Sequence, residues 1–467
     1  MATMNRREMM RATTLGLGVG AWATSRGMAE RSRPTERPNL IFILADDLGY
    51  GDLGCYGQEV IETPNLDRMA REGMRFTQCY AGSTVCAPSR CCLMTGRHTG
   101  HAYIRGNKRV PLPDGEVTVA EGLREAGYAT AIVGKWGLGN EDTSGAPNRQ
   151  GFDYWFGYLD QGHAHNYYPD HLWRNETKVA LDGNVQHAQF QGVAQERRQY
   201  SHDLFTAEAL DYLDRPHGQQ PFFLYLAYTV PHANNERGRH LGDGMEVPDY
   251  GPYADRDWPD PEKGRAAMIA RLDRDIGRLF DRLRALGLDG NTLVFFSSDN
   301  GPHSEGGSDA AFFHSAGPCR GIKRDLYEGG IRIPMIAWWP GHVPAGSVSD
   351  YAWAFWDFMP TALDIAGARP QDGLDGISVL PTLLGREQAP HEFLYWEFHE
   401  RGFAQAVRRG QWKGLRLDPS KPIELYDLGT DTGETRNLAE AHSEIAARMA
   451  EYLETARVPS EHWPIAP

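Results

Sequence analysis

Four unbroken apolar runs, each followed closely by polar residues, constrain the fold of this chain more than any other feature. The runs span residues 40–45, 129–133, 222–226 and 292–296. Each run is short and shows no alternation of apolar and polar residues, which is the pattern of β-strands covered on both faces. The sequence therefore predicts a sheet with helical layers on both sides.

Amphipathic segments separate these runs and predict the helices. In the first of them, Thr63 suits the N-cap, Pro64 suits the first turn, and Gly73 ends the pattern. Strands that alternate with helices indicate an α/β fold, with a large mixed or mostly parallel sheet sandwiched by helices. The predicted helices span residues 63–72, 118–126 and 261–286.

The pattern changes near residue 389. Short alternating runs at 393–398, 405–407, 412–417 and 424–427 precede a helical segment at 443–455. This is typical of a small antiparallel sheet with one helix. We therefore predict a main domain over residues 38–388 and a small C-terminal α+β subdomain over residues 389–467.

The N-terminal segment resembles a bacterial export signal. Residues 5–11 are rich in basic side chains, include the pair Arg6-Arg7, and precede an apolar stretch at 12–23. We interpret residues 1–29 as a twin-arginine signal, cleaved after Ala23 or Ala29. No later segment reaches the ~20 apolar residues that a transmembrane helix needs. A periplasmic or secreted protein without a membrane span is expected.

Charge and cysteine content exclude two classes of protein. The 48 Lys and Arg residues against 62 Asp and Glu residues give a net charge of −14, which excludes a general nucleic-acid partner. A local cleft can still attract a small anion. The six cysteines are irregularly spaced and form no CxxC pair, so neither a zinc ribbon nor a disulfide scaffold is predicted.

Oxygen ligands follow two of the predicted strands. Asp46 and Asp47 come directly after the first run, and Asp299 and Asn300 follow the run at 292–296. Ligands of α/β sheets bind outside the carboxyl ends of the strands, where Lys135 and His232 are also expected. Asp and Asn are common in ordinary turns. Two matching strand ends nevertheless favour a hard cation, Ca²⁺ or Mg²⁺, over zinc.

The stretch over residues 85–97 carries the most specific pattern. Pro88 suits the first turn of a helix, which places Cys86 at the N-terminal end, where free N–H groups favour an anion. Arg90 lies on the same helix face. The residues alone therefore predict a reactive cysteine beside an anion and a cation. Cys91 and Cys92 are expected to be buried and structural.

This stretch resembles the signature of the type I sulfatases, within the alkaline-phosphatase-like superfamily. The signature consists of Cys86-Ala87-Pro88-Ser89-Arg90, followed by Thr95-Gly96-Arg97. The resemblance extends over residues 38–438. Its further blocks lie at 38–49, 321–334, 425–428 and 434–438.

The resemblance implies a mechanism. A separate formylglycine-generating enzyme would oxidise Cys86 to formylglycine, whose hydrate would attack the sulfur atom of a sulfate ester. The second hydroxyl of the hydrate would then lose its proton and expel sulfate. A Ca²⁺ ion would touch this residue and the sulfate, and would lower the pKa of the attacking hydroxyl. Its ligands would be Asp46, Asp47, Asp299, Asn300 and the modified Cys86.

The same resemblance assigns the remaining site residues. Arg90, Lys135 and Lys323 would stabilise charge on the sulfate and on the nucleophile. His232 would contact the sulfate or protonate the leaving alcohol. The implied activity is hydrolysis of sulfate esters, with a sulfated sugar or polysaccharide as the substrate.

One position departs from the family pattern. Many sulfatases carry a histidine where this chain has Gly137, and that histidine contacts the formylglycine hydroxyls. His163 and His165 lie in a run rich in histidine and tyrosine, and are the candidates to replace it or to bind the saccharide. Structural roles for both are the alternative.

Two other functions are compatible with the pattern. Phosphatases and phosphonate monoester hydrolases share the fold, and some of the latter share the formylglycine. Phosphatases of the zinc type use Ser or Thr as the nucleophile, so Cys86 disfavours them. A non-catalytic glycan-binding relative is the other alternative, against which the complete set of ligands and cations argues.

Overall fold

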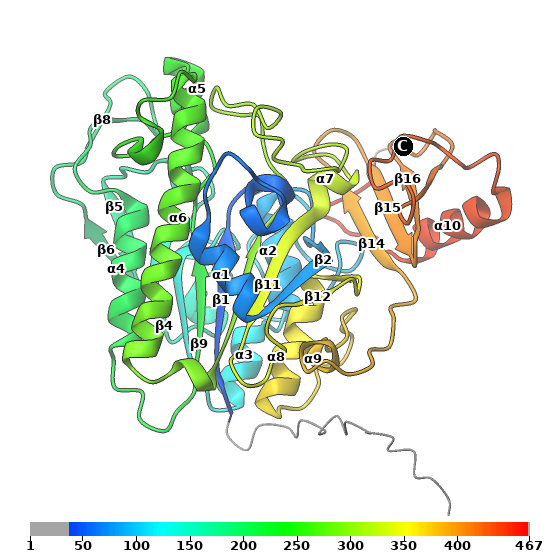
Figure 1. The fold of residues 1–467 in the computed structure, drawn as a ribbon, viewed down its shortest axis with the longest axis horizontal. Coiled ribbons are helices and arrows are strands. Elements are labelled where there is room, and N and C mark those ends of the chain that lie inside the picture. Colours follow the sequence, from blue (N-terminus) through cyan, green and yellow to red (C-terminus); the bar gives the residue numbers. More distant parts are fainter. Residues whose placement is uncertain (1–36, 466–467) are drawn as a thin grey trace, which may run out of the picture. The chain divides into compact units, whose positions relative to one another are not determined.

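The computed structural model describes residues 37–465 and places the predicted strands in one large sheet (Figure 1). The four apolar runs form β1 (Asn39–Ala45), β3 (Ala129–Lys135), β9 (Phe222–Ala227) and β10 (Thr292–Ser298). The other strands of this sheet are β2 (Met74–Tyr80), β4 (Tyr154–Tyr158), β5 (His171–Arg174), β6 (Thr177–Ala180), β11 (Arg332–Trp338), β12 (Ser347–Ser349) and β13 (Trp353–Ala354).

The sheet is parallel in its centre, and antiparallel pairs flank this parallel block on both sides. Its main path runs β12-β2-β11-β10-β1-β9-β3-β4-β5-β6, and β13 pairs with β2. Strands β10, β1, β9, β3 and β4 are mutually parallel, whereas β11 and β5 run antiparallel to their neighbours in this block. The predicted fold class, α/β with a mixed and mostly parallel sheet, is confirmed.

Two helical layers cover the two faces of the sheet. Side chains alternate along β1, so that Phe42 belongs to the core cluster shared with α2, α3 and α8, while Ile43 belongs to the cluster shared with α1, α4 and α6. The three helices predicted from the sequence are α1, α3 and α6. The helices of the main domain are α1 (Pro64–Glu72), α2 (Cys86–Thr95), α3 (Val119–Glu125), α4 (Ser201–Leu213), α5 (Asn235–Leu241), α6 (Asp260–Ala285), α7 (Glu328–Ile331), α8 (Phe358–Ala366) and α9 (Leu380–Leu383).

The start of α1 is capped differently from the prediction. Thr63 occupies the N-cap position, but its hydroxyl makes no cap hydrogen bond and instead accepts from the Gly54 N–H. The carboxylate of Asp273, from α6, accepts the free N–H groups of Asn65 and Leu66. Packing of α6 on α1 thus satisfies donors that a side chain of the cap residue usually satisfies.

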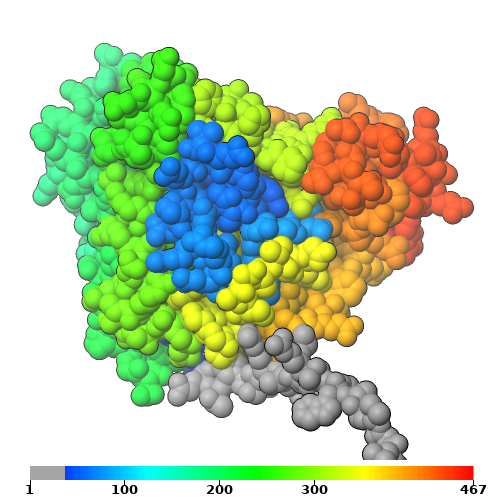
Figure 2. Space-filling view, in the orientation of Figure 1, coloured from blue at the N-terminus to red at the C-terminus, as the bar shows by residue number. Residues whose placement is uncertain are grey.

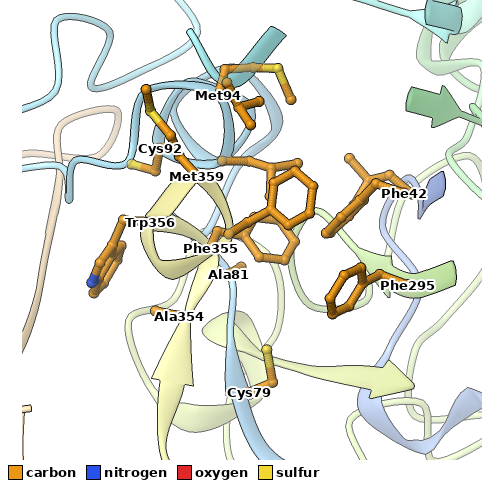
Figure 3. Close-up of a cluster of buried hydrophobic side chains, with 14 of the residues drawn as sticks. Phe42, Cys79, Ala81, Cys92, Met94, Phe295, Ala354, Phe355, Trp356 and Met359 are labelled. Atoms are coloured by element: carbon orange, nitrogen blue, oxygen red, sulfur yellow. The ribbon is translucent and has the colours of Figure 1, made fainter. Parts of the chain in front are cut away.

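Aromatic side chains fill the core beneath α2. Phe42 stacks on Phe295 with 5.9 Å between ring centroids, and Phe355 meets the same ring edge-on (Figure 3). Cys79 and Cys92 lie in this cluster, and burial raises the pKa of both thiols well above the ordinary value. All six cysteines are free, and Cys91 and Cys92 are buried as predicted.

The predicted C-terminal sheet and helix are present. Four antiparallel strands, β14 (Leu394–Phe398), β15 (Ala404–Arg409), β16 (Trp412–Arg416) and β17 (Glu424–Asp427), are followed by α10 (Ser443–Thr455). In Figure 2 the C-terminal residues, orange to red, form one contiguous surface region. Buried Lys413 pairs with Glu328 at 3.0 Å, which ties β16 to α7. The boundary at residue 389 stays a prediction.

The predicted export signal, residues 1–29, lies outside the described residues. Between residues 37 and 465, no helix has both the length and the apolar character needed to cross a bilayer. A short hairpin of β7 (Val185–Gln186) and β8 (Ala194–Glu196) completes the strands of this range.

Candidate active site

The predicted site residues come together at the carboxyl ends of the central strands. Ala45 pairs with Ser298 in the register of β1 and β10, so Asp46 and Asp299 leave the sheet side by side. The Asp299 N–H donates to the Ala45 carbonyl at 3.1 Å. Lys135 is the last residue of β3, and His232 follows β9. The parallel arrangement therefore brings four distant segments to one edge.

An unusual backbone conformation turns two consecutive carboxylates into the same site. Successive side chains of a strand point to opposite faces, which would separate Asp46 from Asp47. Asp47 instead adopts the left-handed conformation, with φ 62°, which aspartate tolerates better than most residues. Lys135 Nζ lies 2.6 Å from Asp46 Oδ2, and Lys323 Nζ lies 2.7 Å from Asp47 Oδ2.

Helix α2 begins at Cys86 and presents its first turn to these carboxylates. The Cys86 thiol donates to Asp46 Oδ1 at 3.3 Å. One turn later, Arg90 donates to Asp299 Oδ2 through Nε at 3.0 Å and Nη2 at 2.8 Å, and to the Lys135 carbonyl. Cys86 and Arg90 are both buried, so α2 fixes a thiol and a guanidinium against the same acidic cluster.

The electrostatics of this cluster fit a bound cation. Burial, together with the charge of Asp46, raises the pKa of Asp299 to about 7 even though Arg90 opposes the shift. Asn300 donates its amide N–H to Asp47, while its Oδ1 is buried with no hydrogen-bond partner among the described residues. Three repelling carboxylates and an orphaned amide oxygen form a donor set suited to a hard cation.

Burial also suppresses the reactivity of the Cys86 thiol. Removal from water, and the charges of Asp299 and Asp46, raise the pKa of this thiol well above its ordinary value. A protonated thiol is a weak nucleophile. Unmodified Cys86 is therefore poorly suited to attack an ester.

A cavity of about 310 Å³ opens over Cys86. Its wall includes His232, Lys323 and His165, and its rim carries the basic side chains of Lys108 and Arg109. His165 stacks on His232, with ring centroids 4.7 Å apart and 16° between the ring planes. The acidic cluster lies behind this wall, in contact with Cys86 and Lys323, and the cavity itself presents several basic groups in a space of the size of a small organic anion.

The structure separates the two histidines of the predicted rim. His165 lines the cavity, whereas His163 does not and packs instead against Tyr158 and His171, with centroids 5.1 and 4.6 Å away. Burial lowers the pKa of His163 to about 4. Only His165 is therefore brought to the cavity.

A glutamine occupies the space beside Gly137. A Cβ atom at Gly137, whose φ is 79°, would lie only 2.4 Å from Gln161 Nε2. That amide nitrogen is buried, has no hydrogen-bond partner among residues 37–465, and belongs to a side chain that lines the cavity. Asn107 also lies at the site, where its side-chain oxygen accepts a hydrogen bond from the Ala87 N–H at 3.0 Å. Neither Gln161 nor Asn107 was predicted from the sequence. Only the position of Gln161, two residues before His163, could have indicated it.

Comparisons with known proteins agree with this arrangement. The Sulfatase family matches residues 38–368, and the C-terminal region of N-sulphoglucosamine sulphohydrolase matches residues 322–459. N-acetylgalactosamine-6-sulfatase of Mus musculus is 33% identical over 460 residues, with 92% of this chain and 82% of the relative covered. Arylsulfatase A of Homo sapiens is 34% identical, with 86% and 83% covered.

A solved structure shows the same likeness in three dimensions. Ps i-CgsB in complex with k-i-k-neocarrahexaose superposes with a TM-score of 0.79 at 29% identity, covering 92% of this chain and 95% of that chain. The family match spans most of the chain, and the relatives align over nearly its whole length. The chain therefore belongs to the sulfatase family of the alkaline-phosphatase-like superfamily and is a sulfuric ester hydrolase.

Proposed function

We propose that the protein releases sulfate from sulfated sugars or polysaccharides, through a formylglycine formed at Cys86 and with Ca²⁺ bound. The observation that carries the proposal is the cavity over Cys86, whose wall offers basic groups to a sulfate and whose residues Cys86 and Lys323 contact the buried acidic cluster suited to a cation. Its wall also carries the polar residues Asn107, Asp160 and Gln161, which could contact sugar hydroxyls. The relatives whose names specify a sugar support the same substrate class.

The proposed nucleophile is the hydroxyl of hydrated formylglycine. Oxidation of Cys86 replaces a thiol whose pKa is raised by burial with a group that water converts into two hydroxyls. One hydroxyl attacks sulfur, and deprotonation of the other expels sulfate and regenerates the aldehyde. Residue 86 lies at the start of α2, where the positive end of the helix dipole favours the developing negative charge.

The basic side chains of the site are proposed to hold the sulfate oxygens. Arg90, Lys135 and Lys323 each contact at least one of the carboxylates and lie around Cys86, so a cation at the carboxylates would leave the lysines available to an anion. His232 donates Nδ1–H to the Ala233 carbonyl, which orients Nε2 toward Lys323 at 3.1 Å. We assign His232 to contact with the sulfate group.

Asp46, Asp47, Asp299, Asn300 and the modified residue 86 are proposed to hold the Ca²⁺. Bound there, the ion would supply positive charge that lowers the pKa of the attacking hydroxyl and polarises the ester. Addition of Ca²⁺ to the chelated protein is expected to raise Tm, because only the folded state presents the ligands. At a Ca²⁺ concentration of 100 times Kd, the free energy of unfolding should rise by about 2.7 kcal/mol. Thermal unfolding with and without Ca²⁺ measures this effect.

Zinc provides the contrasting arm of that experiment. The chelated protein should recover sulfatase activity with Ca²⁺ and not with Zn²⁺, because the donor set is made of oxygen atoms. Full recovery with Zn²⁺ alone would show that the assignment of the metal is wrong.

The substrate class is tested by sulfate release from a panel of defined sulfated saccharides. We expect at least one saccharide to be hydrolysed with a kcat/KM well above that of a simple aryl sulfate, because the polar residues of the cavity wall add contacts. A phosphonate monoester turned over faster than every sulfate ester would favour the phosphonate hydrolase alternative. Binding of saccharides without sulfate release would favour the non-catalytic one.

Gln161, whose amide lies beside Gly137, is proposed to donate a hydrogen bond from this amide to the substrate. The Gly137→Ala variant should lose about 1–2 kcal/mol of stability from its left-handed backbone. It should also raise KM roughly 3- to 10-fold by displacing Gln161, a cost of one hydrogen bond. Gly242→Ala is the matched control, since its φ is 80° and nothing lies within 4 Å of the added Cβ. Equal KM values in both variants would contradict the role of Gln161.

Maturation and location are proposed together. The intact Cys86-Ala87-Pro88-Ser89-Arg90 signature is the expected substrate of a formylglycine-generating enzyme. If residues 1–29 direct twin-arginine export, which carries folded proteins, the oxidation must precede transport to the periplasm or the outside. Detection of formylglycine in the cytoplasmic precursor would test this order.

A further inference from the structure

We propose that His163, Asp170 and His171 form a second metal site, which shares no residue with the acidic cluster and binds a Zn²⁺ ion. His163 lies in a 3₁₀ turn (His163–His165), and Asp170 and His171 lie where β5 begins. One nitrogen of each imidazole and one carboxylate oxygen lie within 4.8 Å of one another. Two imidazoles and a carboxylate are ligand types that zinc binds in proteins.

The ring of His163 offers a buried nitrogen that lacks a partner. Its Nε2 makes no hydrogen bond to any of residues 37–465. A buried polar atom of this kind needs an explanation, and an ion is one of them. Burial lowers the pKa of His163 to about 4, so the ring is neutral at pH 7. With the ring proton on Nδ1, Nε2 presents the lone pair that a metal ion requires.

Asp170 and His171 supply the other two ligands. The rings of His163 and His171 lie with their centroids 4.6 Å apart, and His171 Nδ1 lies 2.7 Å from Asp170 Oδ1. Zinc binds nitrogen and oxygen ligands at about 2.0–2.2 Å, so ligand atoms of a tetrahedral site stand roughly 3.3–3.6 Å apart. Small side-chain rotations reach this spacing. The Asp170 side chain is exposed, which gives the ion a path from solvent.

A group of the same composition elsewhere in the chain lacks the free nitrogen. His98, His101 and Asp375 also offer ligand atoms within 4.8 Å of one another. However, His98 Nδ1 accepts from the Gly100 N–H at 3.1 Å, so the proton of the neutral ring is on Nε2, 3.6 Å from Asp375 Oδ1. A metal ion at Nε2 would have to displace that proton and break a backbone hydrogen bond. This group is therefore not expected to bind zinc.

The proposed ion would have a structural role. It would join the turn of His163 to the start of β5, next to the cavity wall formed by Gln161 and His165. His163 itself does not line the cavity and packs against Tyr158 instead. The ion would therefore hold the cavity wall in place without touching the reacting atoms.

The experiment is a calorimetric titration of Zn²⁺ into protein without a histidine tag, in an excess of Ca²⁺ that occupies the acidic cluster. The wild type should bind one Zn²⁺ saturably. His163→Ala and His171→Ala should each abolish this binding, and Asp170→Asn should weaken it by roughly 10- to 100-fold. Mg²⁺ should not compete, because it prefers oxygen ligands.

His101→Ala is the matched control, because it removes a histidine from the group that has the same composition. It should keep the Zn²⁺ affinity of the wild type. Circular dichroism verifies that each variant is folded, and His171→Ala provides a second test at a partly exposed ring. Zn²⁺ should also slow amide hydrogen exchange within residues 160–174 of the wild type, and should not do so in His163→Ala.

Three results would overturn the proposal. They are the absence of saturable Zn²⁺ binding by the wild type, unchanged affinity in the variants of His163, Asp170 and His171, and protection from exchange only outside residues 160–174. The titration uses no substrate. Failure of the proposed saccharide specificity would therefore leave the result for this metal site unaffected.

Discussion

Replacement of Cys86 by alanine is expected to lower kcat for sulfate ester hydrolysis by at least about 10⁴-fold, because the nucleophile itself is lost. The same loss is expected for the wild-type chain made without a formylglycine-generating enzyme, since burial keeps the Cys86 thiol protonated. Mass spectrometry of the peptide that contains residue 86 measures the modification, and the aldehyde form is about 18 Da lighter than the thiol form.

Two variants control for the loss of a thiol. Cys55→Ser removes the one cysteine of the six that is not fully buried, and should leave kcat unchanged. Cys86→Ser retains a hydroxyl but cannot form an aldehyde, so it should release the alcohol at most once per enzyme and stay sulfated. An active wild-type enzyme with an unmodified Cys86 thiol would refute the proposed nucleophile.

Asp299→Ala is expected to abolish turnover, with kcat lower by at least about 10³-fold. Asp299 holds Arg90 through two hydrogen bonds, accepts from the Asp47 N–H at 3.1 Å, and supplies one of the proposed Ca²⁺ ligands. Its removal therefore disturbs the cation, the guanidinium and the left-handed residue together. Turnover of an aryl sulfate under saturating Ca²⁺ measures the effect.

The control for Asp299 separates folding from chemistry. Metal-free Asp299→Ala should unfold cooperatively, and added Ca²⁺ should raise its Tm far less than that of the wild type, because a ligand is missing. Asp309→Ala, a change at a carboxylate outside the site, should keep both activity and the Ca²⁺ response. Wild-type turnover in Asp299→Ala would show that this residue is not part of the catalytic centre.

The structure also changes how the absent histidine at position 137 is understood. His163 and His165 are the candidates from the sequence to replace it or to bind the saccharide, and the side chain that the structure places beside Gly137 is Gln161. His165 reaches the cavity from another direction, where it stacks on His232 and pairs with Glu236. The departure from the family pattern therefore leads to the proposal of a hydrogen-bond donor at Gln161.

Local patterns were sufficient for the central strands of the sheet, for several of its helices and for the C-terminal sheet and helix. The unbroken apolar runs identified β1, β3, β9 and β10, because a strand covered on both faces has no polar side to alternate with. The capping box at the start of α3 is equally local, because Thr118 and Glu121, which cap each other's backbone N–H groups, are three residues apart. The cap of α1 was missed because Asp273 comes from α6, more than 200 residues away.

The sequence by itself determined the class of fold, the family resemblance and the residues that follow the strands, since each depends on neighbours along the chain. Only the tertiary structure decided that Asp47 turns back beside Asp46, that Gln161 fills the space at Gly137, and that Glu236 meets His165. These contacts join residues far apart in sequence, or depend on a backbone conformation that the surrounding packing imposes. No local pattern encodes such contacts, because their free energy arises only when the sheet edge and its loops have been assembled.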